Sequence, residues 1–123
     1  MAKSVAVIGA SSNRSKFGNK ALRAFLRQGY TVFAINPNEA AVEGQPTFAS
    51  VLDVPGTIDM ATVYVQPEVG VQVMEEIARK GIREVWLNPG ADAPDVVARA
   101  EALGVKTIQA CSIIGIGDTP SRY

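Results

Sequence analysis

The sequence predicts an α/β protein with a Rossmann-like, doubly wound fold, in which five parallel strands in the order 3-2-1-4-5 form the middle of three α/β/α layers. Short β-branched runs alternate with amphipathic helical stretches, and a proline follows three of the predicted strands. This alternation is typical of parallel sheets, because a helix usually connects each strand to the next. A length of 123 residues suits one hydrophobic core, so residues 1–123 are expected to form a single domain.

The first half of the chain predicts two strands and one helix. Ser4–Ile8 is a β-branched run that ends at a glycine, and Thr31–Ile35 is a similar run that ends at an Asn-Pro pair. Between them, residues 18–28 carry apolar side chains on one helical face and basic side chains on the other. Residues 39–56 are expected to form an irregular connection with a short helical turn.

The second half predicts three further strands with two helices between them. Strands are expected at residues 60–65, Glu84–Leu87 and 105–109. The last helix is expected to begin with Asp92 as its N-cap, because an aspartate side chain can accept a hydrogen bond from the first turn. Residues 110–123 are expected to form a tail.

The composition excludes several classes of function. The chain has no histidine, which removes the commonest general base and metal ligand, and no metal-ligand spacing remains. One cysteine, Cys111, excludes an internal disulfide. No apolar run is long enough to span a bilayer and no signal-peptide pattern is present, so a cytoplasmic location without membrane association is expected. Zero net charge and few aromatic residues argue against nucleic-acid binding.

The charges are segregated along the chain. Residues 1–38 contain six basic residues and no acidic residue, whereas the remainder contains six basic and all twelve acidic residues. The positive charge of residues 1–38 would attract an anionic ligand. A solvent-exposed basic helix explains the same composition, so both interpretations stay open.

The junction between the first strand and the first helix is the main candidate for phosphate binding. A helix start offers unpaired N–H groups and a positive dipole end, and serine hydroxyls and two cations accompany it here. The alternative is that the residues are small only because strand and helix pack tightly. The junction comprises Gly9, Ala10, Ser11, Ser12, Asn13, Arg14, Ser15, Lys16, Phe17 and Gly18.

This junction lacks the fingerprints of two large nucleotide-binding classes. After Gly9 the next glycine is Gly18, so the G-x-G-x-x-G turn is missing, and no Gly-Lys-Ser/Thr closes a Walker loop. The second strand ends in Asn36, where NAD sites carry an acidic residue. An NADP-dependent oxidoreductase remains the alternative, because Arg14 or Lys16 would suit a 2′-phosphate.

Prolines mark the ends of three predicted strands, as Asn36-Pro37, Gln66-Pro67 and Asn88-Pro89. Each proline removes a backbone donor, so simple strand termination accounts for any one of them. The carboxyl ends of parallel strands meet at one edge, however, where such sheets bind ligands. The three pairs together predict an apolar crevice with amides at its mouth, which suits a flat base with a long arm.

These motifs resemble the stand-alone CoA-binding proteins, which are similar to the N-terminal domain of the succinyl-CoA synthetase α subunit. The resemblance rests on Gly9-Ala10-Ser11, Ile35-Asn36-Pro37, Val63-Tyr64-Val65-Gln66-Pro67 and Val85-Trp86-Leu87-Asn88-Pro89-Gly90. It implies a Rossmann-like fold that holds coenzyme A, or an acyl-CoA, along the strand ends. It does not imply ligase chemistry, because the catalytic histidine of the synthetase lies outside this domain.

The resemblance also implies roles for particular positions. Residues 9–12 and 16–18 would cradle the pyrophosphate, Ile35, Asn36 and Pro37 would flank the adenosine, and Val65, Gln66 and Pro67 would line the arm opposite Leu87, Asn88 and Pro89. The synthetase has a basic residue two positions after the strand-two proline. This chain has Glu39 there, so a 3′-phosphate would depend on Arg14 or Lys16.

Cys111 matches a cysteine common at this position in the small CoA-binding proteins. It follows the last predicted strand at the ligand edge of the sheet, so a mixed disulfide with the CoA thiol is one interpretation. A small buried apolar residue is the other. The sequence favours a non-catalytic CoA carrier or sensor. A small NADP-dependent enzyme and a regulatory subunit that has lost its ligand, as Glu39 would suggest, remain alternatives.

Overall fold

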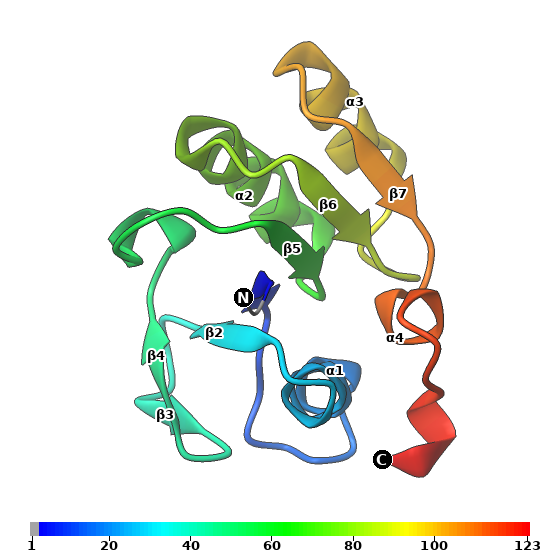
Figure 1. Ribbon diagram of the computed structural model, residues 1–123. Coiled ribbons are helices and arrows are strands. Elements are labelled where there is room, and N and C mark those ends of the chain that lie inside the picture. The colour runs from blue at the N-terminus through cyan, green and yellow to red at the C-terminus, as the bar shows by residue number, and fades with distance from the viewer. Residues whose placement is uncertain (1–2) are drawn as a thin grey trace.

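A seven-stranded sheet with β1 (Ser4–Ile8) near its centre organises the protein (Figure 1). The structure is a computed structural model and describes residues 3–123. The strand order is β3-β4-β2-β1-β5-β6-β7, and every pair is parallel except β3 with β4. The other strands are β2 (Thr31–Ile35), β3 (Ala41–Val42), β4 (Gln45–Phe48), β5 (Met60–Val63), β6 (Glu84–Leu87) and β7 (Thr107–Gln109).

The expectation of five strands in the order 3-2-1-4-5 is wrong in both number and order. The five expected strands form, but the third of them, β5, pairs with β1 on the side opposite to β2. The place beside β2 belongs to β4, which lies within the expected irregular connection. With β4 counted as the third strand, the parallel strands follow the doubly wound order 3-2-1-4-5-6.

The sequence of β4 does not have the pattern from which a strand is predicted. Its four residues, Gln-Pro-Thr-Phe, lack alternating apolar side chains, and proline normally argues against a strand. Pro46 is tolerated because its outer neighbour is the two-residue strand β3, so β4 lies close to the sheet edge. Only Thr47 and Phe48 pair with the inner strand β2.

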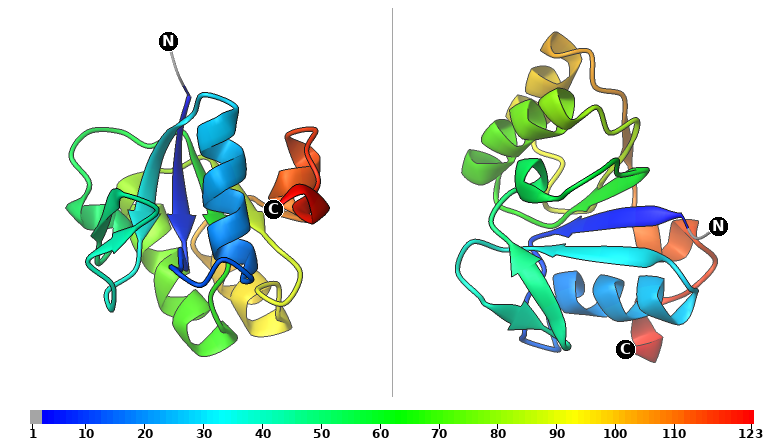
Figure 2. Two further views of the ribbon diagram at one scale, coloured as in Figure 1. Left: turned by 90° about the horizontal axis from the view of Figure 1, so that it is seen from below. Right: turned by 60° about the vertical axis from the view of Figure 1, so that its left-hand side comes forward.

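Helices cover both faces of the sheet (Figure 2). On one face lie α1 (Phe17–Arg27), α4 (Ser112–Gly115) and the 3-10 turn Pro120–Arg122. On the other face lie α2 (Pro67–Lys80), α3 (Pro94–Ala102) and the 3-10 turn Val51–Asp53. None of the helices in residues 3–123 is both long and apolar enough to cross a membrane.

The period of two along β1 divides the core into two layers. Ala6 and Ile8 pack in the cluster that contains the buried residues of α2 and α3, whereas Val5 and Val7 pack in the cluster of α1. All four side chains are buried, as expected for a central parallel strand covered on both faces.

The start of α3 and the C-terminal segment both differ from what the sequence predicts. The N-cap of α3 is Ala93 rather than Asp92, because the helix begins at Pro94, and the Asp92 carboxylate instead accepts a hydrogen bond from the Gly90 N–H (3.2 Å). The expected tail folds back onto α1, and the Gln28 amide donates to the Ile116 carbonyl (3.0 Å).

A buried polar network joins β5, β6 and α4. The Asn88 side chain donates to Thr62 Oγ1 (2.7 Å) and the Val63 carbonyl (3.0 Å), and its Oδ1 accepts from the Ser112 N–H (2.9 Å). Ser112 Oγ lies 2.7 Å from Thr62 Oγ1 and 3.2 Å from the Tyr64 hydroxyl. Every polar group of the Asn88 side chain is therefore occupied within the protein.

Replacing Asn88 should destabilise the fold. Asn88→Ala leaves the Ser112 N–H and the Val63 carbonyl without this partner in a buried site, so we expect a loss of about 2–3 kcal/mol in the free energy of unfolding. Urea denaturation followed by circular dichroism measures it. The control Asn38→Ala, at an exposed position, should change stability by less than about 0.5 kcal/mol. Equal effects of the two substitutions would contradict the structural role of the network.

Candidate functional site

Two adjoining cavities lie at the carboxyl ends of the central strands. Their volumes are about 560 and 550 Å³. Both are lined by Gly9, Lys16, Tyr64, Val65 and Gln66, so they form two parts of one crevice. This is the edge of the sheet at which doubly wound proteins bind their ligands.

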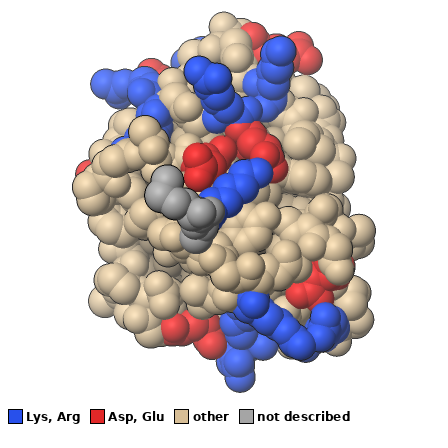
Figure 3. All heavy atoms as spheres, viewed as in Figure 1, with Lys and Arg blue, Asp and Glu red and all other residues tan. Residues whose placement is uncertain are grey.

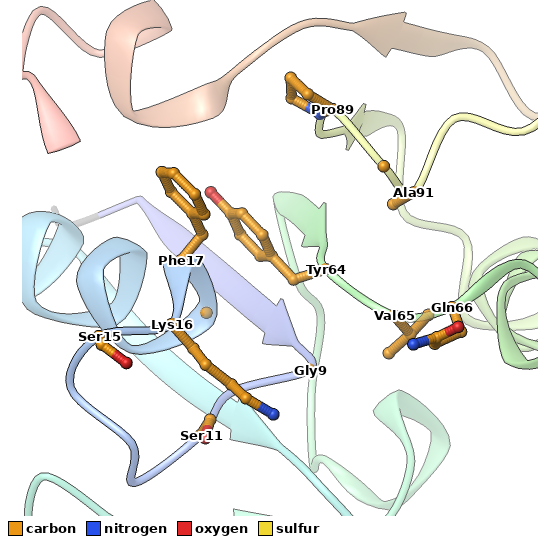
Figure 4. Close-up of a pocket in the computed structure, with 12 residues that line it drawn as sticks. Gly9, Ser11, Ser15, Lys16, Phe17, Tyr64, Val65, Gln66, Pro89 and Ala91 are labelled. Carbon is orange, nitrogen blue, oxygen red and sulfur yellow. The ribbon is translucent and has the colours of Figure 1, made fainter.

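The first cavity lies between the start of α1 and the ends of β5 and β6 (Figure 4). The Lys16 side chain extends into it from the helix start, toward the side where Ser11 lies. Lys16 is also the N-cap residue, and no side chain caps the helix there. The first N–H groups of α1 and one ammonium group are therefore available to an anion in this cavity.

The turn that precedes α1 is braced by its own side chains. Asn13 Oδ1 accepts from the Ser15 N–H (3.0 Å) and hydroxyl (2.7 Å), and Ser11 Oγ accepts from the Asn13 N–H (3.1 Å). The Lys16 N–H donates to the Asn13 carbonyl at 3.0 Å. These contacts hold the turn in one conformation beside the cavity.

Packing alone requires the two glycines of this junction. A Cβ on Gly18 would lie 2.2 Å from the Gly9 carbonyl oxygen. A Cβ on Gly9, whose φ is +92°, would lie 2.9 Å from the Tyr64 carbonyl oxygen. The interpretation of this junction as tight strand–helix packing is therefore correct for Gly9 and Gly18, whatever else the loop binds.

The second cavity is walled by the end of β2 and by one face of α2. Ile35, Asn36 and Pro37 line it together with residues such as Val69 and Glu76. The Asn36 amide donates to the Ala10 carbonyl (2.8 Å), and its Oδ1 accepts from the Asn38 N–H (2.7 Å). Asn36 therefore ties the end of β2 to the turn after β1 and fixes the shape of this wall.

Tyr64 is a residue of the crevice that the sequence analysis did not single out. Its ring lies beside Phe17 and faces Pro89 across the first cavity (Figure 4). Burial raises the pKa of the Tyr64 hydroxyl, which lies against Ser112 (3.2 Å). An aromatic residue inside an apolar run is typical of a core strand, so no local signal distinguishes it.

The structure brings most of the expected binding residues together. Those lining the crevice are Gly9, Ser11, Lys16, Phe17, Gly18, Ile35, Asn36, Pro37, Val65, Gln66 and Pro89. Those outside its lining are Ala10, Ser12, Arg14, Pro67, Leu87 and Asn88. Ala10, Leu87 and Asn88 are buried beneath the crevice, whereas Ser12 and Arg14 lie on the exposed side of the loop.

Two carboxylates approach the basic loop from the segment after β2. Glu39 Oε2 accepts from the Ser12 N–H at 3.0 Å. Glu43 Oε2 lies 3.4 Å from Arg14 Nε and accepts from the buried Asn19 amide at 3.1 Å. The segregation of charge in the sequence therefore does not persist here, and acidic and basic side chains also lie close together on the face in Figure 3.

Glu39 is ionised at neutral pH. The hydroxyl and the backbone N–H of Ser12 hold the pKa of its carboxyl below the ordinary value, and the nearby Lys16 ammonium acts in the same direction. The Arg14 side chain is mostly exposed and lies 3.4 Å from Glu43, which offsets part of its charge. Lys16 is thus the cation through which an anionic ligand would be held in the crevice.

Cys111 lies at the same edge of the sheet but lines neither cavity. It is half-buried, lies two residues after the end of β7, and is the N-cap residue of α4. Within residues 3–123, no group of three or more cysteine, aspartate or glutamate side chains could hold a metal ion.

Curated proteins that resemble the chain are CoA ligases. It is 32% identical over 116 residues to the ADP-forming acetate–CoA ligase I of Archaeoglobus fulgidus, covering 86% of this chain and 17% of that protein. It is 35% identical over 89 residues to the α subunit of the ADP-forming acetate–CoA ligase I of Pyrococcus furiosus, covering 68% of this chain and 19% of that subunit. The chain thus spans less than a fifth of either relative.

Solved structures include relatives of the same size. A conserved hypothetical protein of Pyrococcus furiosus superposes with a TM-score of 0.82 at 31% identity, covering 94% of this chain and 99% of that one. The apo acetyl-coenzyme A synthetase 1 of Ca. Korarchaeum cryptofilum has a TM-score of 0.75 at 25% identity, covering 88% of this chain and 26% of that one. A family model described as the CoA binding domain matches residues 3–117. The chain therefore belongs to the CoA-binding domain family, as its strand-end motifs indicate.

Proposed function

We propose that the chain binds coenzyme A or an acyl-CoA in the crevice at the carboxyl ends of its strands, as a non-catalytic carrier or sensor. One observation carries the proposal: the two cavities meet at Lys16 and the open start of α1, within a domain of the CoA-binding family. CoA matches that arrangement, because its pyrophosphate would lie where the two cavities meet, with the adenine base on one side and the long pantetheine arm on the other.

The crevice offers a distinct environment to each part of CoA. The pyrophosphate lies against Lys16 and the N–H groups at the start of α1, and Ser12 and Arg14 flank it from the outer side of the loop. The adenosine lies in the second cavity between Ile35 and Pro37. The pantetheine arm is held by residues that follow β5 and β6, namely Tyr64, Val65, Gln66 and Pro89. Pro67 begins α2 behind them, and Leu87 and Asn88 support them from below.

The ionisable side chains of the crevice favour binding over catalysis. They are Lys16, Tyr64 and Glu76. The raised pKa of Tyr64 keeps its hydroxyl protonated, and Glu76 accepts a hydrogen bond from the Ser50 hydroxyl. The nucleophile and base of an acyl-transfer site would have to lie within hydrogen-bond reach of one another at the ligand. Within residues 3–123, the hydroxyls bonded to Glu76 and Tyr64 are those of Ser50 and Ser112, and neither serine lines the crevice.

Calorimetric titration tests the proposal. We expect CoA to bind at micromolar concentration, about −8 kcal/mol. Lys16→Ala should weaken binding about tenfold, because a charge-assisted hydrogen bond to the pyrophosphate is lost. Lys106→Ala removes the same charge from an exposed position outside the crevice and should leave the affinity unchanged. Binding of NADP without CoA would instead support the oxidoreductase alternative.

The thiol of Cys111 gives a second prediction. If the arm of CoA reaches the end of β7, the Cys111 thiolate attacks the disulfide of oxidised CoA, forms a mixed disulfide with one half and releases the other as a CoA thiolate. Intact mass spectrometry should then show one CoA adduct per chain that dithiothreitol removes. Cys111→Ser is the control and should show none. An unmodified wild-type chain after the same treatment would leave Cys111 as a structural residue.

A further inference from the structure

We propose that Glu39 is a specificity-determining residue, which makes the crevice favour an adenosine ribose with free hydroxyls over one that carries a phosphate. The inference rests on the proposed function, because it concerns the adenosine end of the same crevice. It predicts that the preferred ligand is a dephospho-CoA-like nucleotide, with CoA itself bound more weakly.

The position of Glu39 carries the inference. Its Oε2 accepts from the Ser12 N–H in the turn after β1 (3.0 Å) and from the Asn36 amide at the end of β2 (3.3 Å). Asn36 and the next two residues, Pro37 and Asn38, line the second cavity. The carboxylate thus bridges the turn after β1 and the end of β2 next to the second cavity, at the rim rather than in its lining, and it is held there from both sides.

The carboxylate also occupies a backbone donor that would otherwise be open to an anion at this point. The Ser12 N–H is part of the turn proposed to face phosphate, and Glu39 already accepts its hydrogen bond. The charged groups near this point are few: Lys16 is the cation that acts on Glu39, and the exposed Arg14 lies 3.4 Å from a second carboxylate, Glu43. A ribose phosphate would therefore meet the fixed negative charge of Glu39, and the nearest cation, Lys16, also serves the pyrophosphate.

A ribose hydroxyl, in contrast, complements this carboxylate. A carboxylate has about four accepting lone pairs, so Glu39 retains capacity to accept from a hydroxyl. In doubly wound dinucleotide sites, an acidic residue at the end of the second strand accepts from the ribose, whereas an arginine accommodates a ribose phosphate. Asn36 holds the strand end here but uses its side chain to brace the turn, so Glu39 supplies the acidic group three residues later.

The test compares the affinities of CoA and dephospho-CoA, which differ only in the 3′-phosphate. In the wild-type protein we expect dephospho-CoA to bind about tenfold more tightly, corresponding to 1.4 kcal/mol. Glu39→Gln should bring the two affinities to within about threefold, and Glu39→Lys should reverse their order. Glu101→Gln, an exposed carboxylate on α3, is the matched control and should keep the wild-type ratio.

Further measurements keep the result interpretable. Higher salt should bring the wild-type affinities for dephospho-CoA and CoA closer together, because salt screens the repulsion between the ribose phosphate and a partly solvent-exposed carboxylate. Circular dichroism establishes that each variant is folded, and the wild-type ratio needs no variant at all. If wild-type protein binds CoA as tightly as dephospho-CoA or more tightly, the role of Glu39 is refuted while CoA binding stands. If it binds neither ligand, the proposed function itself fails, and the specificity role with it.

Discussion

The close approach of α1 to the end of β1 is the contact on which the crevice depends. The helix begins so near the Gly9 carbonyl that Gly18 has no room for a Cβ, which would lie 2.2 Å from that oxygen. On the other side, the Gly9 position is confined by the Tyr64 carbonyl. These two contacts fix the helix start, its N–H groups and Lys16 at one edge of the sheet, so that the geometry of the crevice follows from backbone packing.

The buried network around Asn88 supports the same edge from below. It connects β5, β6 and α4 through hydrogen bonds of 2.7 to 3.0 Å, in a place where an unpaired polar group would cost stability. Since Tyr64 contacts Ser112 of this network, the aromatic wall of the crevice is coupled to the packing of the C-terminal segment. The C-terminal residues, which look like a tail in the sequence, thereby become part of the scaffold.

Folding brings acidic side chains against the basic turn and so changes the charge balance beside the crevice. Residues 1–38 have no acidic residue, yet Glu39 and Glu43 fold against the turn that carries Arg14 and Lys16. As a result, the Lys16 ammonium lies in the crevice while the Glu39 carboxylate lies beside the end of β2. Under the proposed function, this balance would make the ribose, and not only the pyrophosphate, a point of discrimination.

The sequence by itself determined the strands and helices whose patterns are local. The buried period of two in β1, the apolar face of α1 and the prolines after β2, β5 and β6 depend on neighbouring residues, and they also located the edge where the crevice lies. Only the tertiary structure decided the strand order, the insertion of β4, the place of Tyr64 in the crevice and the contact of Glu39 with Ser12. These features arise from pairings between segments far apart along the chain. Such pairings depend on which sheet edges and surfaces remain to be covered, and no local period of residues encodes that.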